Sequence, residues 1–502
     1  MALPILLSLQ IQDPGALRRA WVGVGLAMAL GGCAVGPDFV RPAAPVAHAY
    51  TREILPGDTL TAGGQAQRFA PGAAIAADWW RMFRSAKLDS LVRQSITNNP
   101  SLQAAEASLR ESQDRLRAGY GVFYPQVDAG LEGRRQRTAP VQQGLQTPGT
   151  IFNLVTLSGT IGYTLDVFGG ERRMVEGLGA QVEYQRNAAR AAYLSLSANV
   201  VNTSVARAAY AAQIRITEQL IQLENEQLHA TEAQVRAGTT PYANVLSLRG
   251  LIAAQQAQLA PLRQKISQAE HLLATLQGQV PSEASQPDID LEDFSLPTNL
   301  PVSLPSELVR QRPDILAAEA QLHVASANIG VATAAMFPSF SLTGTYGAAG
   351  SSLGNLAGAG GRFWSIGPAI AIPLFQGGRL WFGRKAAIDA HQQAEAAYRQ
   401  TVLAAFGQVA DTLKALEHDA EALGAQVEAR SAAGEALRLL QANYRAGLVA
   451  YVDVLVADVQ FHEASIACLQ AIAQRHQDTV ALFVALGGGW WNAPPTEGGQ
   501  TP

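Results

Sequence analysis

Few residues in this chain of 502 have the types and spacing that chemistry requires. The eight histidines include no pair four residues apart, the spacing that places two imidazoles on one helix face to bind a metal. The glycine-rich stretch 351–361 lacks the Gly-Lys-Ser/Thr ending of a phosphate-binding loop, and we assign it to a loop between strands. Two cysteines are too few for a disulfide scaffold or a cysteine metal site. We therefore predict no enzyme, no metal site and no cofactor.

One cysteine does stand where a covalent modification is expected. Cys33 follows two glycines at the end of a short apolar run, 21–30, which is itself preceded by Arg18 and Arg19. This order matches a bacterial lipoprotein signal, whereas the alternative is an ordinary signal peptide with a chance cysteine. We predict cleavage before Cys33 and lipid on its thiol and its new amino group. Ala34, in the place of an aspartate, favours sorting to the outer membrane.

The net charge and the composition indicate which kinds of molecule this chain is built to contact. The chain has 37 basic and 41 acidic residues, a formal net charge of −4, which argues against nucleic acid as a partner because such domains are usually strongly basic. Charged residues make up only 16% of the chain, below the roughly 25% that is usual for soluble domains. This balance favours surfaces that pack against other protein or lipid.

An internal duplication organises the chain. Residues 99–125 align without a gap on 312–338, and 168–172 resembles 375–379. A third match, Arg-Ala-Gly followed by Tyr and Val-Leu, occurs in the same order in both halves. We predict a signal peptide (1–32), a lipidated N-terminal linker and equatorial segment (33–87), a first repeat (88–278), an exposed acidic and proline-rich linker (279–305), a second repeat (306–491) and a disordered tail (492–502).

Each repeat begins with an amphipathic helix, at 88–120 and 306–335, and continues with two segments of period two. Their alternation of apolar and polar residues is typical of transmembrane β-barrels and fits a soluble sandwich poorly. Four strands are too few to close a barrel, which needs roughly eight, and open edges cannot face lipid. Several chains must therefore share one barrel, and a trimer would give twelve strands. The apolar positions are Val127, Ala129, Leu131, Val155, Leu157, Ile161, Tyr163, Leu165, Val167, Phe340, Leu342, Tyr346, Trp364, Ile366, Ile370, Ile372 and Leu374.

Long helical hairpins follow the strands. We predict helices over 171–236 and 380–445, each about 100 Å long at 1.5 Å per residue, with returning helices over 244–276 and 453–486. Gly238 and Gly447 stand at the turns, as expected for helix stops. Because these helices are too polar for lipid, they should project from the membrane as coiled coils.

Together these features resemble the TolC-like outer membrane factors, most closely the lipoprotein branch that serves RND-type multidrug efflux systems. The resemblance covers nearly the whole mature chain. It rests on Cys33-Ala34-Val35-Gly36-Pro37-Asp38-Phe39, Asp78-Trp79-Trp80, Arg312-Pro313-Asp314-Ile315, Phe337-Pro338-Ser339-Phe340-Ser341-Leu342-Thr343-Gly344, Pro373-Leu374-Phe375, Tyr444-Arg445-Ala446-Gly447, Asp453-Val454-Leu455 and Ala485-Leu486-Gly487-Gly488-Gly489-Trp490.

The resemblance implies an α+β membrane protein: a homotrimer with a twelve-stranded β-barrel in the outer membrane, continued by a periplasmic α-helical barrel that is closed at its tip. It also implies docking to a periplasmic adaptor (membrane fusion) protein and an inner-membrane RND-type transporter, for the export of drugs or other solutes. Two alternatives remain open, namely a duct for type I protein secretion and a structural coiled-coil lipoprotein that does not conduct.

The same resemblance assigns a gate to the helical tips. By motif match, Tyr444 is a tyrosine that links the two coiled coils, and Asn244 replaces its usual aspartate partner, which should weaken the bond. Asp453 matches an aspartate that rings the aperture, although it could equally cap the returning helix. Val456 stands where a second aspartate would be and could gate by dewetting. Arg445 belongs to the same tip, or serves as a partner of its helix dipole.

Overall fold

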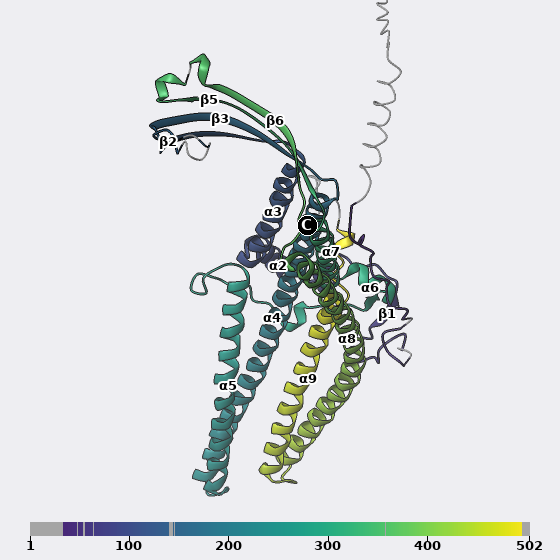
Figure 1. Ribbon diagram of the computed structural model, residues 1–502. Coiled ribbons are helices and arrows are strands. Elements are labelled where there is room, and N and C mark those ends of the chain that lie inside the picture. Colours follow the sequence, from purple (N-terminus) through teal and green to yellow (C-terminus); the bar gives the residue numbers. More distant parts are fainter. Residues whose placement is uncertain are drawn as a thin grey trace, which may run out of the picture. The chain divides into compact units, whose positions relative to one another are not determined.

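The strands that follow the first helices of each repeat form one four-stranded antiparallel sheet (Figure 1). The computed structural model describes residues 34–47, 49–53, 56–63, 65–139, 144, 146–356 and 358–493. All four predicted strands are present in the spatial order β2-β3-β5-β6, which leaves β2 and β6 as the two edges. Register follows the alternation of the sequence, with Leu131 opposite Leu157 and Tyr346 opposite Trp364. The strands are β2 (Gln126–Arg137), β3 (Ile151–Leu165), β5 (Ser339–Gly350) and β6 (Arg362–Ala371).

Two helical hairpins of matched length make up most of the remaining chain (Figure 1). The long helix of each hairpin has 67 residues and the returning helix has 35. Their ends agree with the predicted ones to within one residue, except that α5 and α9 start two residues earlier than predicted, at Tyr242 and Tyr451. No helix among the described residues is both long enough and apolar enough to cross a membrane. The hairpins are α4 (Gly170–Arg236) with α5 (Tyr242–Leu276), and α8 (Arg379–Arg445) with α9 (Tyr451–Ala485).

The prediction of one continuous helix at the start of each repeat is wrong. A proline divides each of these stretches into two helices. The residue before a proline is disfavoured in the helical conformation, and proline itself is well accommodated at the first position of a helix. Asn99 and Arg312 are accordingly extended, and a new helix starts at the proline that follows each of them. The resulting pairs are α2 (Ala86–Asn98) with α3 (Pro100–Gly119), and α6 (Pro305–Gln311) with α7 (Pro313–Ala334).

The acidic linker is not the exposed connector that we predicted. Ile289, Phe294 and Leu300 are buried, since apolar residues at intervals among the acidic ones turn inward. Its strand β4 (Asn299–Val302) pairs in parallel with β1 (Arg68–Pro71) of the N-terminal segment. The linker is therefore part of the packed core.

The compact units of the chain cut across the two repeats. The first unit comprises residues 34–41, 111–182 and 320–396, and holds the sheet with the adjoining helix ends. The second comprises the rest of the described chain and holds both hairpin tips. Each repeat contributes to both units, because its long helices run out of one unit and into the other.

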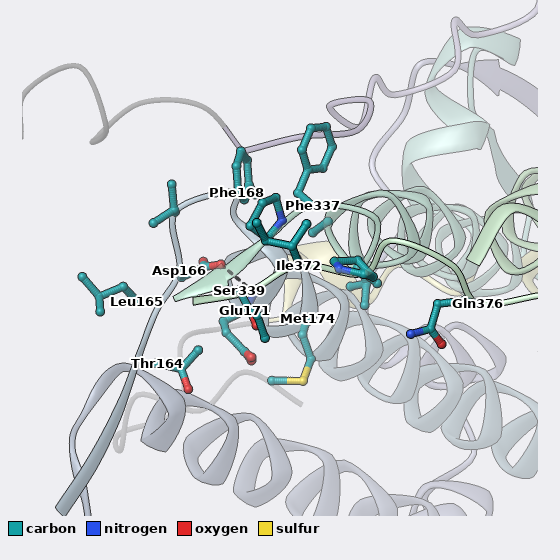
Figure 2. Close-up of a pocket in the computed structure, with 18 residues that line it drawn as sticks. Thr164, Leu165, Asp166, Phe168, Glu171, Met174, Phe337, Ser339, Ile372 and Gln376 are labelled. Carbon is teal, nitrogen blue, oxygen red and sulfur yellow. Dashed lines mark hydrogen bonds between the residues drawn. The ribbon is translucent and has the colours of Figure 1, made fainter. Parts of the chain in front are cut away.

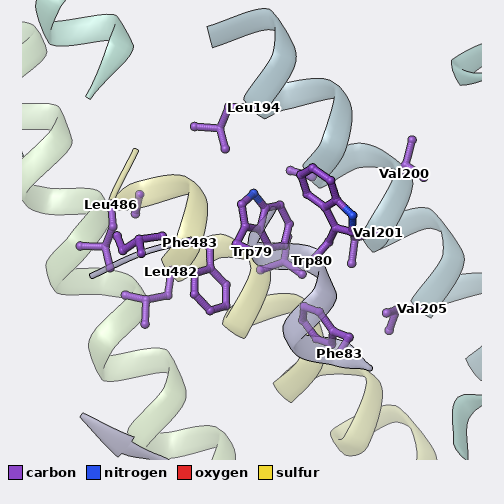
Figure 3. Close-up of a cluster of buried hydrophobic side chains, with 14 of the residues drawn as sticks. Trp79, Trp80, Phe83, Leu194, Val200, Val201, Val205, Leu482, Phe483 and Leu486 are labelled. Carbon is purple, nitrogen blue, oxygen red and sulfur yellow. The ribbon is translucent and has the colours of Figure 1, made fainter. Parts of the chain in front are cut away.

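The core of the second unit gathers around a short 3₁₀ helix, Trp79–Phe83 (Figure 3). Trp79 and Phe83 are fully buried, and the Trp79 ring stacks on Phe483 of α9 at 5.4 Å between centroids. Burying aromatic side chains of this size contributes a large apolar term to stability. Trp79 and Trp80 are thus packing anchors of this core. Cys468 is also buried.

Candidate functional site

One face of the sheet is apolar and open. Side chains alternate between faces along each strand, so register places the apolar residues of all four strands together. Val127, Trp364 and Ile366 are 73%, 73% and 69% exposed. The opposite face is polar: it carries Thr, Ser and Gly residues of β3, β5 and β6, and Asp128, Glu132 and Arg134 of β2. A contiguous apolar face of this size marks contact with lipid or another chain.

A hollow of about 490 Å³ lies where the strands meet the helices (Figure 2). Asp166 forms part of its wall and caps α4, since its carboxylate accepts hydrogen bonds from the backbone N–H groups of Glu171 and Arg172 at 3.1 and 2.9 Å. The ring of Phe168 from the first repeat stacks on that of Phe337 from the second, with centroids 4.6 Å apart. The strand ends at Thr164, Ser339 and Ala371 therefore line this hollow together with the first turns of α4.

The first described residues pack against this junction. The backbone N–H of Val35 donates to the carbonyl of Phe168 at 3.0 Å. Ala34 lies so close to Gly169 that a β-carbon built there would come within 2.6 Å of it. Cys33, the signal peptide and residues 494–502 lie outside the described residues. Ala34, which follows Cys33, is thus held between the end of β3 and the start of α4.

A chain of charges fastens the same N-terminal segment. Arg173, with only 6% of its side chain exposed, pairs with Asp38 at 2.6 Å and Glu176 at 2.7 Å. Glu176 in turn contacts the His323 ring at 2.8 Å, and Phe39 stacks on that ring with centroids 4.2 Å apart. Residues 34–39 are therefore clamped by α4 and α7.

The Arg-Pro-Asp motif of the second repeat ties helix ends together. Arg312 is buried and donates to the carbonyl of Ala485, the last residue of α9, at 2.9 Å. Its remaining donors reach Gln408 at 2.8 Å and Asp314 at 2.7 Å. In the first repeat, the Asn99 side chain binds the end of α5 in the same way, by donating to the carbonyl of its last residue, Leu276, at 2.9 Å. Sequence analysis quoted the motif without recognising this function.

The predicted helix stops at the tips are confirmed. Gly238 and Gly447 have φ angles of +73° and +74°, which only glycine adopts readily. In each turn, the residue after the glycine donates back to a helix carbonyl five residues earlier, at 2.9–3.0 Å. Both long helices therefore end in the same hydrogen-bonded motif.

The expected gate residues gather at the second tip. Asp453 is in the first turn of α9, three residues after the N-cap Ala450, so the prediction that it is itself the N-cap is wrong. Its carboxylate still accepts from the N–H of Ala450 at 3.0 Å. Asp453, Val456 and Arg445 are exposed, and Val456 keeps 53% of its side chain open.

The expected link between tyrosine and asparagine is not formed within this chain. The Tyr444 ring packs on Tyr451 instead, with centroids 5.2 Å apart. Asn244 is half-buried in the first turn of α5, and no hydrogen bond among the described residues joins it to Tyr444. The sequence did place both residues at the tips.

Sequence analysis missed a buried acidic pair near the tips. Both carboxylate oxygens of Glu224 on α4 are buried without a hydrogen-bond partner in the described chain, and only 2% of the residue is exposed. Burial, together with the charge of Asp458 on α9, raises the pKa of Glu224 to about 7. Burial likewise raises the pKa of Asp458 to about 6. Farther along the same helices, Thr217 contacts His462 at 3.2 Å, and burial lowers the pKa of that imidazole.

No cluster of three or more His, Cys, Asp or Glu within the described ranges could hold a metal ion. The prominent features are instead an open-edged sheet with one apolar face and two long hairpins. These are architectural features, and they can be compared directly with known proteins.

The profile of the "Outer membrane efflux protein" family matches residues 91–279 and 304–488. The chain is 32% identical to outer membrane protein OprJ of Pseudomonas aeruginosa over 483 residues, covering 94% of this chain and 97% of that one. It is 29% identical to SilC of Salmonella typhimurium, described as a probable outer membrane lipoprotein, over 473 residues and 92% and 96% of the two chains. The solved outer-membrane channel OprN superposes with a TM-score of 0.82 at 28% identity, covering 91% of this chain and all of that one. The chain belongs to the outer membrane efflux protein family.

Proposed function

We propose that three copies of this chain close one barrel in the outer membrane. The observation that carries the proposal is the apolar sheet whose edges, β2 and β6, are both open. Unpaired backbone groups cannot face hydrocarbon, so each edge needs a partner strand. Neighbouring strands run antiparallel and the sheet has an even number of them, so β6 of one copy can pair with β2 of the next and continue the pattern.

The width of the lumen favours three copies. Two copies would give eight strands, and a barrel of that size is filled by its own side chains. Twelve strands leave room for an aqueous passage lined by the Thr, Ser and Gly residues of the inner face. The long helices of each copy would continue this passage as a coiled-coil barrel.

The chain is an outer-membrane efflux channel, which is a transport duct and not an enzyme. In the assembly that we propose, its helical tips dock to a periplasmic adaptor protein, and an inner-membrane RND-type transporter delivers drugs or other solutes. The matched lengths of the two hairpins support a docking end at which all tips lie level. Outer-membrane lipid surrounds the barrel, and the lipid on Cys33 anchors the N-terminus beside it. The place of Ala34 at the strand–helix junction supports this anchor.

The gate that we propose lies at the tips. Three exposed Asp453 side chains would form a negative ring that prefers cations, and three Val456 side chains would form an apolar constriction behind it. In the closed state Tyr444 would turn from Tyr451 to Asn244 and hold the two hairpins together, while Arg445 would supply further donors at the tip.

Conductance of the purified, lipidated protein in a planar bilayer tests the channel, and migration as an SDS-resistant, heat-modifiable trimer tests the assembly. We expect small, cation-selective openings from the trimer, and larger ones from Tyr444→Phe. Absence of current from both proteins would contradict the channel and favour a structural coiled-coil lipoprotein. Co-purification with the secretion machinery instead of an RND-type pump would favour the duct for protein secretion.

A further inference from the structure

The sheet ends in arginines at the end distant from the helices. Arg135 and Arg137 close β2, and Arg362 opens β6. Arg135 and Arg137 lie four and six residues beyond Leu131 and therefore point to the same, apolar face. Arg362 is opposite Ala348 and two residues from Trp364, which places it on that face as well. All three are exposed.

These arginines have no acidic counterpart. On the other face of β2, Arg134 pairs with Glu132 at 2.6 Å. In contrast, no carboxylate in the described part of the chain forms an ion pair with Arg135, Arg137 or Arg362. The sequence explains why, because the stretches 133–165 and 339–371 contain no Asp or Glu at all. Three positive charges per chain therefore face outward without compensation.

Two aromatic residues near Arg362 indicate how deep this arginine lies relative to the bilayer. Trp364 and Tyr346 are cross-strand neighbours on the apolar face, and 73% and 62% of their side chains are exposed. Such residues sit at the boundary between hydrocarbon and headgroups. Arg362 is two residues farther out, about 6.6 Å along the strand, which is the level of the headgroups. Arginine at that depth avoids the cost of about 2–4 kcal/mol that it meets at the bilayer midplane.

We propose that Arg135, Arg137 and Arg362 bind the phosphate groups of the phosphorylated glycolipid that forms the outer leaflet of the outer membrane. The planar guanidinium group makes paired hydrogen bonds to phosphate oxygens, and the apolar face below accommodates acyl chains. This inference rests on the proposed barrel. There, β6 of one copy adjoins β2 of the next at a spacing of about 4.8 Å. The end of β6 that carries Arg362 then lies beside the strand that carries Arg135 and Arg137 of its neighbour, and three equal sites form.

The test is lipid binding to the purified trimer, measured by native mass spectrometry. The probes are bisphosphorylated lipid A, its monophosphorylated form and phosphatidylglycerol. The variants are Arg135→Gln, the triple variant Arg135→Gln/Arg137→Gln/Arg362→Gln, and the control Arg134→Gln. The control changes charge equally at the adjacent position, on the opposite face.

We expect wild type to prefer bisphosphorylated lipid A to both other lipids. Arg135→Gln should weaken that binding about tenfold, the effect of losing one charge-assisted hydrogen bond, and the triple variant should abolish the preference. Arg134→Gln should bind as wild type does. Equal binding of lipid A and phosphatidylglycerol, unchanged binding by the triple variant, or an equal loss in Arg134→Gln would each overturn the proposal.

Conductance of the same triple variant separates this inference from the channel itself. Normal trimers and currents with lost lipid preference support the glycolipid site. If wild-type trimers conduct but show no preference among the lipids, the glycolipid site is wrong while the channel stands. If wild type neither forms trimers nor conducts, the proposed function fails first.

Discussion

The carboxylate of Asp453 accepts a hydrogen bond from the backbone N–H of Ala450 at 3.0 Å, at the point where the second hairpin turns back. One side chain thereby satisfies a free donor at the start of α9 and leaves a negative charge exposed at the tip. A cap at this position needs only an acceptor, whereas a selectivity ring needs the charge. The two functions can therefore be separated by substitution.

Asp453→Asn should keep the cap and remove the charge. We expect unchanged thermal stability with a loss of cation selectivity, measured from reversal potentials in asymmetric salt. Asp453→Ala should lose selectivity and also about 1 kcal/mol of stability, because the backbone N–H of Ala450 loses its acceptor. Glu428→Gln, an equal change of charge on an exposed part of α8 distant from the tip, should alter neither. Selectivity that persists in Asp453→Asn would reduce this residue to a helix cap.

The contact between α4 and α9 should weaken as the pH rises. The pKa values of Glu224 and Asp458, about 7 and about 6, exceed those of unfolded carboxyl groups, so the folded chain holds the protons more tightly. The free energy of unfolding should then fall between about pH 4 and pH 7, by on the order of 1–3 kcal/mol, and stay low above pH 7. Amide hydrogen exchange of α9 at pH 5.5 and pH 8 measures this change.

Glu224→Gln provides the matched comparison, because its amide cannot ionise. We expect its α9 exchange to depend less on pH than that of wild type, with Asp458 still titrating, and to be slower than wild type at pH 8. The control Glu226→Gln changes an exposed carboxylate two residues away and should behave as wild type does. A pH profile shared by all three proteins would show that other groups dominate.

Arg312 should matter more to stability than its counterpart Asn99. Removing the guanidinium by Arg312→Ala leaves the carbonyl of Ala485 without its donor and breaks the bond to Gln408, which should cost roughly 2–4 kcal/mol. Asn99→Ala should cost about 1–2 kcal/mol, since it removes the cap of α3 and the single bond to the carbonyl of Leu276. Arg310→Ala, on the exposed side of α6, serves as control in the same thermal melts. Equal melting temperatures for the Arg310 and Arg312 variants would refute this assignment.

Gly36→Ala should release the N-terminal segment. Gly36 has a φ of +94°, and a β-carbon there would lie 2.5 Å from the Cα of Gly330. We expect faster proteolysis of the segment 34–39 in this variant, detected by mass spectrometry of the cleaved N-terminus. Gly57→Ala, where a β-carbon meets nothing within 4 Å, should be cleaved at the wild-type rate. Cleavage at equal rates in both variants would show that the close approach does not hold the segment.

Local patterns predicted the strands and hairpins well. The period-two alternation located β3 and β6, and the glycines at 238 and 447 marked the turns, because both features depend on residues close in sequence. The end of α2 before Pro100 could also have been predicted from the local sequence, because proline disfavours the helical conformation in the residue before it. We missed it because the apolar periodicity continues across the break.

Contacts between distant segments could not be predicted in the same way. Arg475 on α9 is buried because it donates to Gln67 at 3.0 Å and to Thr59 at 3.2 Å, which no local pattern reveals. Glu224 and Asp458 likewise read as ordinary surface charges in their own helices. Their burial arises only when α4 packs on α9.

The equal lengths of the two hairpins determine how many adaptor proteins the tips can bind. In the proposed trimer, six hairpins end level with one another but belong to two alternating kinds, because only one kind carries Asp453. An adaptor that reads the features common to both, such as the Arg-Ala-Gly turn, finds six places. An adaptor that reads Asp453 and its neighbours finds three. The stoichiometry of the assembled pump would therefore report which surface its adaptor recognises.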